Sequence, residues 1–410
     1  MSQPIRVAIS GGGLAGASLI RALLQYPHLD VHIFESAPAF EEKGMAIGIT
    51  RNAQAALDLL GPPAPQLLRR AGAVPMKGVR FMIAEGEGQG QVIDEVDNSS
   101  GKRLTSIIHR GAYLQQLLAG VPAERMHASK KLEEINRNPD GSVTLSFADG
   151  TSHECDILVG ADGIHSVVRQ HVLGKDDPAA QPRNTGVWLI MAGIPYEEAH
   201  AVMGPHLVNA ADAREYSWVQ FVVASDDEGP QPPNQWRRQV TADEIAKLYT
   251  NWPEPLRQAV HKLLFSQAPE QTAMYLWEHP PARTYASGPV CVMGDAAHAT
   301  TPWHGSGGGM SIEDTLILST LRGRAKSPKE AQAALVAYDH VRRPRTQRIV
   351  ESSVKTGMML LDKGGQTGIQ MKQAGNLLPR WDFILDIDML EHRNEAIQKM
   401  LDELAEPGSA

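Results

Sequence analysis

A glycine-rich loop between an apolar strand and a helix constrains this chain more than any other feature. Residues 5–9 form an apolar run typical of a buried parallel strand, and the sequence Gly-Gly-Gly-Leu-Ala-Gly follows at 11–16. Residues 17–24 then have a helical pattern, and residues 31–34 have the pattern of a second strand. This order predicts a βαβ unit of about 30 residues, the start of a Rossmann-like α/β domain.

The glycines of the loop have distinct physical tasks. Gly11 permits a tight turn, Gly13 lets the backbone approach a pyrophosphate group, and Gly16 lets the helix pack closely on the strand. The N-terminus of the following helix offers unpaired N–H groups and a favourable dipole to an anion. The loop therefore predicts a dinucleotide site, against the alternative of a glycine-rich turn in an unrelated α/β protein.

Glu35 strengthens this interpretation. It ends the second strand, 22 positions after Gly13, where a carboxylate can accept a hydrogen bond from a ribose hydroxyl. Because a glutamate disfavours a 2′-phosphate, the pocket favours the adenosine of FAD or NAD over that of NADP.

Two later motifs place carboxylates at strand ends. An apolar run ends in Asp162-Gly163, which in isolation is more often a plain turn than a site. A second run ends in Gly294-Asp295 and precedes a glycine-rich tract that holds Gly305, Gly307 and Gly308, with a helix expected from about Ile312. A carboxylate at a strand end can hold a ribityl hydroxyl, and backbone amides in a glycine tract can meet a flavin ring or a pyrophosphate.

The remaining pattern predicts an inserted second unit. We expect a first part of the α/β domain at 1–180, an antiparallel sheet domain at 181–277, the return of the first domain with a long helix at 278–362, and a C-terminal helical tail at 363–410. Pro344 is expected to kink or break the long helix. Other predicted elements are helices at 52–60, 111–118 and 242–249, strands at 143–147, 187–192 and 218–224, and a turn at 138–141.

Composition excludes several classes of protein. The net charge of −8 over 410 residues argues against a general nucleic-acid or anionic-membrane binder. No apolar stretch reaches the roughly 18 residues of a membrane span, no signal peptide is recognisable, and a cytoplasmic location is expected. Cys155 and Cys291 lie in apolar runs and are expected to be buried, and no spacing predicts a metal site.

The three motifs together resemble those of the class A FAD-dependent aromatic monooxygenases, particularly the salicylate hydroxylase-like branch with its fungal secondary-metabolism members. The segment 294–318 carries most of this resemblance, which extends over residues 5 to about 355. The resemblance implies a Rossmann-like FAD-binding domain of the aromatic hydroxylase type, an inserted antiparallel β-sheet substrate domain and C-terminal helices. It also implies FAD contacts for Gly11, Gly13, Leu14, Ala15, Gly16, Glu35, Gly48, Arg110, Asp162, Asp295, Gly305, Gly307 and Gly308.

The substrate side departs from the family pattern. Many relatives carry an arginine on the first strand of the substrate sheet, where this chain has an apolar run that includes Trp188 and Met191. Tyr216 or Trp218 on a later strand stands where some relatives use a tyrosine. Trp188, Met191 and Trp218 would make an apolar pocket, which leaves no evident group to deprotonate a substrate.

Two histidines and a proline near the third motif complete the list of candidates. The resemblance places Pro302 beside the reactive flavin carbon. His304 could touch the substrate or serve a structural role, whereas His298 is expected to be a packed or hydrogen-bonded histidine.

The implied activity is hydroxylation of an aromatic or phenolic small molecule with O2 through a flavin C4a-hydroperoxide. NADPH or NADH would be a transient electron donor, because no second dinucleotide loop is present. One alternative is epoxidation or oxidative rearrangement of a polycyclic or alkene natural-product intermediate, and another is a non-catalytic flavin-binding protein. The expected partners are the small-molecule substrate and O2 only, in a monomer or homodimer.

Overall fold

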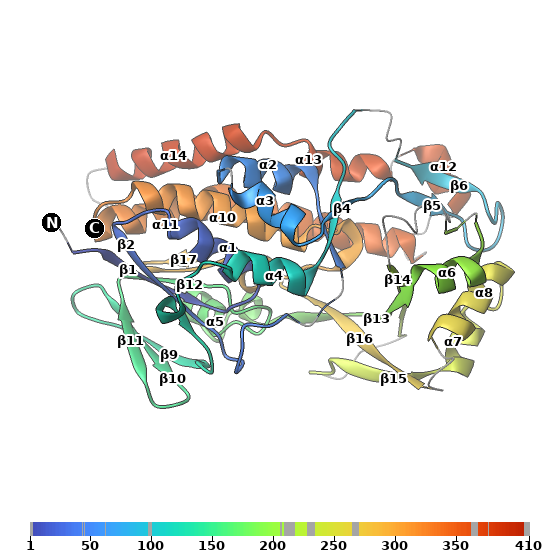
Figure 1. Ribbon diagram of the computed structural model, residues 1–410, viewed down its shortest axis with the longest axis horizontal. Coiled ribbons are helices and arrows are strands. Elements are labelled where there is room, and N and C mark those ends of the chain that lie inside the picture. The colour runs from blue at the N-terminus through green and yellow to red at the C-terminus, as the bar shows by residue number, and fades with distance from the viewer. Residues whose placement is uncertain are drawn as a thin grey trace.

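The computed structural model shows an elongated α/β protein with two sheet regions side by side (Figure 1). The described residues are 3–42, 44, 46–61, 63–96, 101–205, 207–208, 218–227, 234–264, 270–361, 368–375 and 377–405. Tyr216, one of the predicted pocket residues, lies outside the described residues.

The larger region is built on a six-stranded sheet with the order β17-β18-β12-β1-β2-β8. All neighbouring pairs are parallel except β17 with β18. The central strands read as unbroken apolar runs because both faces of the sheet are covered. The strands are β1 (Ile5–Ser10), β2 (Leu29–Phe34), β8 (Met126–His127), β12 (Ile157–Gly160), β17 (Ala286–Ser287) and β18 (Val290–Val292).

Helices cover one face of this sheet and a smaller sheet covers the other. On the helical side lie α1 (Leu14–Leu23), α10 (Gly307–Arg324), α11 (Pro328–Leu360) and α14 (Met389–Ala405), as Figure 1 shows. The other side holds α5 (Val167–Leu173) and the antiparallel sheet β11-β10-β9. That sheet consists of β9 (Leu132–Arg137), β10 (Val143–Phe147) and β11 (Ser152–Cys155). Cys155 and Cys291 are both buried here as free thiols.

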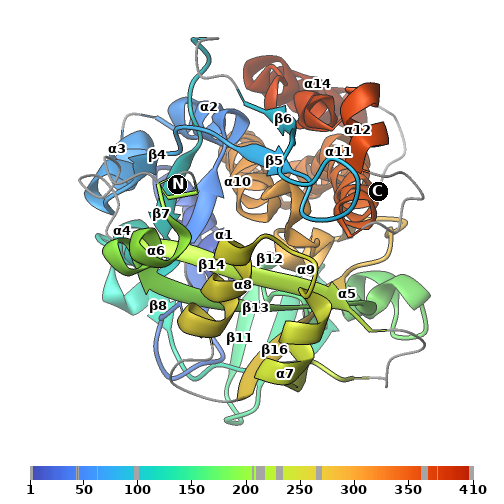
Figure 2. The ribbon, with the colours of Figure 1, turned by 90° about the vertical axis from the view of Figure 1, so that its right-hand side faces the viewer.

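The second region is a four-stranded antiparallel sheet with the order β14-β13-β16-β15. One face packs against three helices, α6 (Tyr196–Met203), α7 (Ala242–Leu248) and α8 (Glu254–Ala259), which face the viewer in Figure 2. The strands are β13 (Arg183–Pro195), β14 (Trp218–Asp226), β15 (Arg237–Thr241) and β16 (Glu270–Glu278).

Smaller elements connect the two regions. A three-stranded sheet, β3-β7-β4, and a hairpin, β5-β6, were not expected from the sequence. Their bounds are β3 (Ala46–Ile49), β4 (Val74–Pro75), β5 (Arg80–Met82), β6 (Val92–Glu95) and β7 (Ser106–His109). The remaining helices are α2 (Arg51–Leu59), α3 (Pro63–Arg70), α4 (Arg110–Leu118), α9 (Asp295–His298), α12 (Gly368–Ala374) and α13 (Asp382–Leu385), with 3-10 turns η6 (Pro302–His304) and η7 (Leu378–Trp381).

Two helix predictions need correction. Of the kink or break expected at Pro344, the break does not occur: α11 is continuous, because the packing of its buried face against α14 and α10 outweighs one lost hydrogen bond. The helix α10 begins at Gly307 rather than near Ile312. Its first glycines face β3 and α2, where a Cβ at Gly309 would lie 3.4 Å from Thr50 Oγ1, so tertiary packing overrides their low helix propensity.

Candidate functional site

The β1–α1 loop has the shape that its glycines predict. Gly11 has φ of +107°, and a Cβ there would lie 2.2 Å from the carbonyl oxygen of Ala161 on the neighbouring strand end. A Cβ at Gly16 would lie 2.0 Å from the carbonyl oxygen of Gly11. At Gly13, by contrast, the nearest atom to a Cβ would be Glu42 Oε2 at 3.8 Å. Gly11 and Gly16 are therefore required by the fold itself, whereas Gly13 leaves room for a ligand.

The start of α1 is open to an anion. Gly13 is the N-cap residue and offers no side-chain cap, and the first turn carries no acidic residue. Beside it, Glu35 Oε2 accepts a hydrogen bond from the Gly12 N–H at 2.7 Å, and Oε1 accepts one from Ala37 N–H at 2.7 Å. The carboxylate is thus held against the glycine loop, at the end of β2, where a ribose would approach.

Arg110 reaches the same loop, in partnership with a residue that the sequence did not single out. Its Nη2 lies 2.6 Å from Glu42 Oε1, and its Nε is buried without a hydrogen-bond partner among the described residues. Gly44 makes room for this arginine, because a Cβ there would lie 2.8 Å from Arg110 Cδ. Burial raises the pKa of Glu42, Arg110 lowers it, and the nearby Asp295 raises it further. No local motif could have predicted this pair, since it depends on the approach of α4.

Asp295 stands exposed at the first turn of α9, and its carboxylate accepts no hydrogen bond within the described part of the chain. Its position is fixed from below by Asp314 on α10, which accepts a hydrogen bond from Gly294 N–H at 3.0 Å. His298 Nε2 lies 2.7 Å from the same carboxylate oxygen, and both side chains are fully buried. His298 is therefore a hydrogen-bonded structural histidine, as expected.

Asp162 lies at the same sheet edge, but its carboxylate is already used. It accepts hydrogen bonds from Ser166 Oγ at 2.5 Å and from Val167 N–H at 2.9 Å, which caps α5. Burial raises the pKa of Asp162 while these hydrogen bonds lower it. The Asp162 backbone packs against Gly11, since a Cβ there would lie 2.8 Å from Asp162 Cα, and the carboxylate caps α5.

The glycine tract before α10 lies beside β3. Gly305 has φ of +62°, and α10 begins at Gly307 without a side-chain cap. A Cβ at Gly308 would lie 3.5 Å from Ile47 Cδ1, so β3, which carries Gly48, runs next to the helix start. The start of α10 therefore offers uncapped N–H groups beside β3.

A cavity of about 570 Å³ lies beside β3 and the turn before α10. It brings together Gly48, Pro302, His304 and Gly305, which come from two distant parts of the chain. Most of the other lining side chains are aromatic or aliphatic, namely Met76, Val79, Phe81, Val96, Leu104, Ile107, Trp303, Leu378, Trp381 and Leu385. The charged lining residues are Arg51, Glu95, Lys102, Arg103 and Asp382.

His304 is a poor proton acceptor in this position. It is 3% exposed, and burial together with the nearby Arg380 lowers its pKa to about 4. Its Nε2 lies 2.8 Å from Thr356 Oγ1, while Nδ1 is buried without a partner in the described residues. A neutral imidazole is therefore held in the cavity wall, and it can orient neighbours better than it can remove a proton.

The antiparallel sheet presents its other face toward β3. Met191 is 39% exposed and lies 3.8 Å from Gln220 Nε2, and Gln220 Oε1 accepts a hydrogen bond from Ala46 N–H at 3.1 Å. Met191 thus sits beside the strand that carries Gly48, although it does not line the 570 Å³ cavity.

The expectation that Trp188 lines a pocket is wrong. Trp188 is 1% exposed and packs in the core beneath α7, where its Nε1–H donates to Asp227. Residues three apart on a strand point to opposite faces, so Trp188 and Met191 cannot both face the site. The structure describes only the backbone of Trp218. This residue is the first of β14 and pairs with Pro195 on β13.

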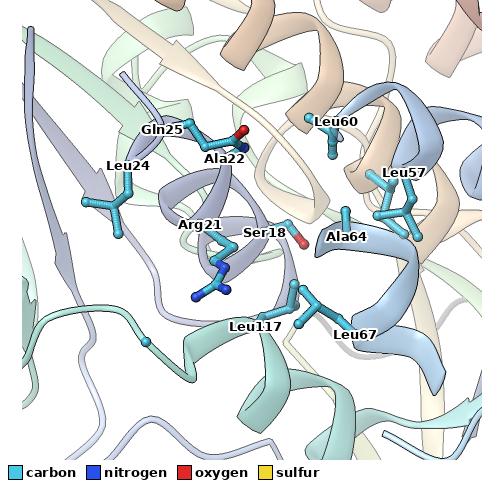
Figure 3. Close-up of a pocket in the computed structure, with 12 residues that line it drawn as sticks. Ser18, Arg21, Ala22, Leu24, Gln25, Leu57, Leu60, Ala64, Leu67 and Leu117 are labelled. Carbon is cyan, nitrogen blue, oxygen red and sulfur yellow. The ribbon is translucent and has the colours of Figure 1, made fainter. Parts of the chain in front are cut away.

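A second cavity, of about 230 Å³, lies between α1, α2, α3, α4 and α10. Figure 3 shows Ser18 and Arg21 on α1, with Leu57, Ala64 and Leu67 across from them. None of the predicted cofactor or substrate residues lines it, and its walls are mostly aliphatic. The larger cavity is therefore the candidate for chemistry.

The described ranges hold neither a metal-binding cluster nor a membrane-spanning helix. No group of three or more His, Cys, Asp or Glu residues there is arranged to hold a metal ion. Within the same ranges, no helix is long and apolar enough to span a membrane.

Comparisons with known proteins agree with this geometry. A family model described as an FAD binding domain matches residues 5–353, so the chain belongs to this family of FAD-binding flavoproteins. The 6-methylsalicylate 1-monooxygenase atA of Aspergillus terreus is 35% identical, over 86% of this chain and 82% of the relative. A salicylate hydroxylase of Pseudomonas putida is 29% identical, over 95% of each chain. The protein is accordingly an FAD-dependent monooxygenase.

Solved structures show the same fold. A salicylate hydroxylase substrate complex superposes with a TM-score of 0.81 at 23% identity and covers all of both chains. The structure of CtdE with FAD and a substrate gives a TM-score of 0.80 at 17% identity, over 98% of this chain and all of that one. These likenesses support the Rossmann-like FAD-binding domain with an inserted antiparallel sheet and C-terminal helices.

The residues of the candidate cofactor site fit FAD. The open position at Gly13 and the uncapped α1 suit a pyrophosphate, and the unpartnered Asp295 suits a hydroxylated chain. The glycines at the start of α10 leave its N–H groups accessible to a flat ring system.

Proposed function

We propose that the protein transfers one oxygen atom from O2 to a phenolic aromatic acid, with NADH or NADPH as the transient donor of electrons. The observation that carries this proposal is the 570 Å³ cavity, which has Gly48, Pro302 and Gly305 on its lining beside aromatic and aliphatic walls. When bound, FAD supplies the redox chemistry that accepts hydride and activates O2. The chain's own residues position the substrate and exclude water.

The charges of the cavity support an acidic substrate. Arg51, Lys102 and Arg103 contribute to its lining, although Arg51 and Lys102 contact Asp386 and Arg103 contacts Asp58. Two relatives are named for salicylate or 6-methylsalicylate, which carry a hydroxyl and a carboxylate on one ring. We infer that the positive field of these paired cations, and not an arginine of the substrate strand, attracts the acidic substrate.

The same cavity offers no strong base. His304 is neutral over the physiological pH range because its pKa is lowered to about 4, and it can only orient the substrate or its neighbours. We infer that the phenol is either bound as such or loses its proton to solvent through the charged side of the cavity.

The test measures NADH and NADPH oxidation by the FAD-loaded protein with salicylate, 6-methylsalicylate and uncharged phenols under 18O2. We expect at least one acidic phenol to accelerate oxidation and to yield a product with one 18O atom. Acceleration that yields only hydrogen peroxide with every compound would contradict the proposal.

A further inference from the structure

The far wall of the large cavity comes from a part of the chain that the family match does not include. That match ends at residue 353, whereas Leu378, Trp381, Asp382 and Leu385 all line the cavity. These residues belong to η7 and α13, two short turns between α12 and α14. The C-terminal segment is thus part of the same cavity as Pro302.

Trp381 is the central side chain of this wall. Its Nε1–H donates to the carbonyl oxygen of His304 at 3.2 Å, and the two rings lie 4.7 Å apart between centroids. On its other side, the ring of Phe81 on β5 lies 5.8 Å away. The indole therefore bridges the loop that carries Pro302 and the hairpin that forms the opposite side of the cavity.

The wall is held rigidly from behind. Arg345 on α11 donates to the carbonyl oxygens of Phe383 at 3.1 Å and Ile384 at 2.9 Å. Ile384 is fully buried in a cluster with Met310. Arg380 Nε–H donates to Thr356 Oγ1 at 2.7 Å.

Asp386, at the C-terminal end of this wall, forms ion pairs with two cations. Arg51 Nε lies 2.8 Å from Asp386 Oδ1, and Lys102 Nζ lies 3.1 Å from Asp386 Oδ2. These contacts tie the segment to α2 and to the chain before β7. A wall fixed at both ends and in the middle cannot retreat to admit a larger ligand without losing several contacts at once.

We propose that the segment 378–386 is the specificity wall of the substrate cavity and that Trp381 limits the size of the ring system it admits. This inference rests on the proposed function, because it takes the cavity to be the substrate site. Removal of the indole would enlarge the cavity between the Pro302 loop and β5, since the backbone behind it is fixed. Larger aromatic acids would then gain affinity relative to single-ring acids.

The test compares salicylate with 1-hydroxy-2-naphthoate, a two-ring analogue with the same pair of polar groups. The Kd of each is measured on FAD-loaded protein from the change in flavin absorbance, for the wild type, W381F, W381A and the control W252A. Trp252 packs against Tyr249 in the helical layer of the other region and does not line the cavity. We expect W381A to shift the ratio of the two Kd values at least tenfold toward the naphthoate, W381F to shift it less, and W252A to leave it unchanged.

Each outcome decides between the proposals. If both compounds bind and W381A leaves the ratio unchanged, the specificity wall is overturned and the proposed function stands. If neither compound perturbs the flavin in any variant, the proposal of an acidic phenol falls, and the wall falls with it. Should W381A fail to fold, as judged by circular dichroism, W381F and W381L give the graded shift that the proposal requires.

Discussion

Arg110 and Glu42 form an ion pair, with 2.6 Å between Nη2 and Oε1, beside the position that Gly13 leaves open. Asp295 lies close enough to raise the pKa of Glu42, and so does Glu35. Three carboxylates therefore surround a helix start that is built to receive a pyrophosphate, and one arginine offsets them. We expect a pyrophosphate bound there to compete with Glu42 for that arginine.

We expect E42Q to bind FAD more tightly than the wild type, because it removes the carboxylate nearest to Gly13. The gain should be about three- to tenfold, or roughly 0.7–1.4 kcal/mol. Quenching of FAD fluorescence on titration with apoprotein measures it, with the exposed neighbour Glu41 changed in E41Q as the matched control. Weaker binding by E42Q would show instead that Glu42 holds Arg110 in place for the cofactor.

At Asp295, by contrast, we expect removal of the carboxylate to weaken FAD binding. Removal of the negative charge alone would favour an anionic cofactor. We expect D295A nevertheless to weaken FAD retention about tenfold, because the carboxylate would accept a hydrogen bond from the cofactor. A hydrogen bond to a charged group contributes roughly 1.5–3 kcal/mol. D295N keeps an acceptor and should retain most of the affinity. Flavin content per chain after gel filtration, together with the Kd, decides the matter. Unchanged flavin content in D295A would refute this role.

The sequence predicted the β1–α1 loop well because the requirement there is local. Gly11 needs a positive φ and Gly16 a close approach to Gly11, and both needs follow from spacing within one βαβ unit. Glu42 could not be predicted from the sequence, because its role depends on α4, which brings Arg110 beside it. Charge pairs between distant segments leave no local pattern in the sequence.

The substrate side was harder to predict for two physical reasons. The face of Trp188 could have been derived from strand alternation, since Met191 three residues later must point the other way. The wall at Trp381, by contrast, is made by short turns whose position depends on Arg345 and Ile384 behind them. Nothing in the periodicity of residues 363–388 indicates that contact.

A cluster of three histidines should make stability depend on pH. His32 Nδ1 lies 2.9 Å from His127 Nε2, and the ring of His153 lies 5.4 Å from that of His32. Burial, followed by the neighbouring imidazoles, lowers the pKa of His153 from 6.5 to about 4. Because the folded pKa is below the unfolded one, the free energy of unfolding should be maintained above pH 6.5 and lost as the pH falls from 6.5 to about 4.

The variant H153F isolates this effect from that of acidic residues. Phenylalanine fits beside Phe34, whose ring lies 4.8 Å from that of His153, and it cannot take up a proton. We expect H153F to recover roughly 1–2 kcal/mol of the loss between pH 7 and pH 4.5, a value discounted for the half-exposed cluster. Urea unfolding at the two pH values measures it. An identical loss in both proteins would exclude the cluster as the cause.

Two fully buried arginines should differ in how a change to methionine affects the free energy of unfolding. Arg342 donates to Glu313 at 2.6 Å and to Asp314 at 2.8 Å, both within a network that also contains Arg345. The three guanidinium nitrogens of Arg322 have no hydrogen-bond partner in the described part of the chain, and burial lowers its pKa to about 10. R342M leaves two buried carboxylates short of a partner, and we expect it to cost about 3 kcal/mol.

R322M, by contrast, replaces an unpaired buried cation with an apolar side chain of similar length. We expect it to change the free energy of unfolding by less than about 1 kcal/mol, or to increase it, because the desolvation penalty of the guanidinium disappears without breaking a pair. Urea denaturation of both variants, followed by circular dichroism at pH 7.5, gives the comparison. An equal cost for R322M and R342M would mean that Arg322 has a partner of comparable strength, such as a bound anion or buried water, in the folded protein.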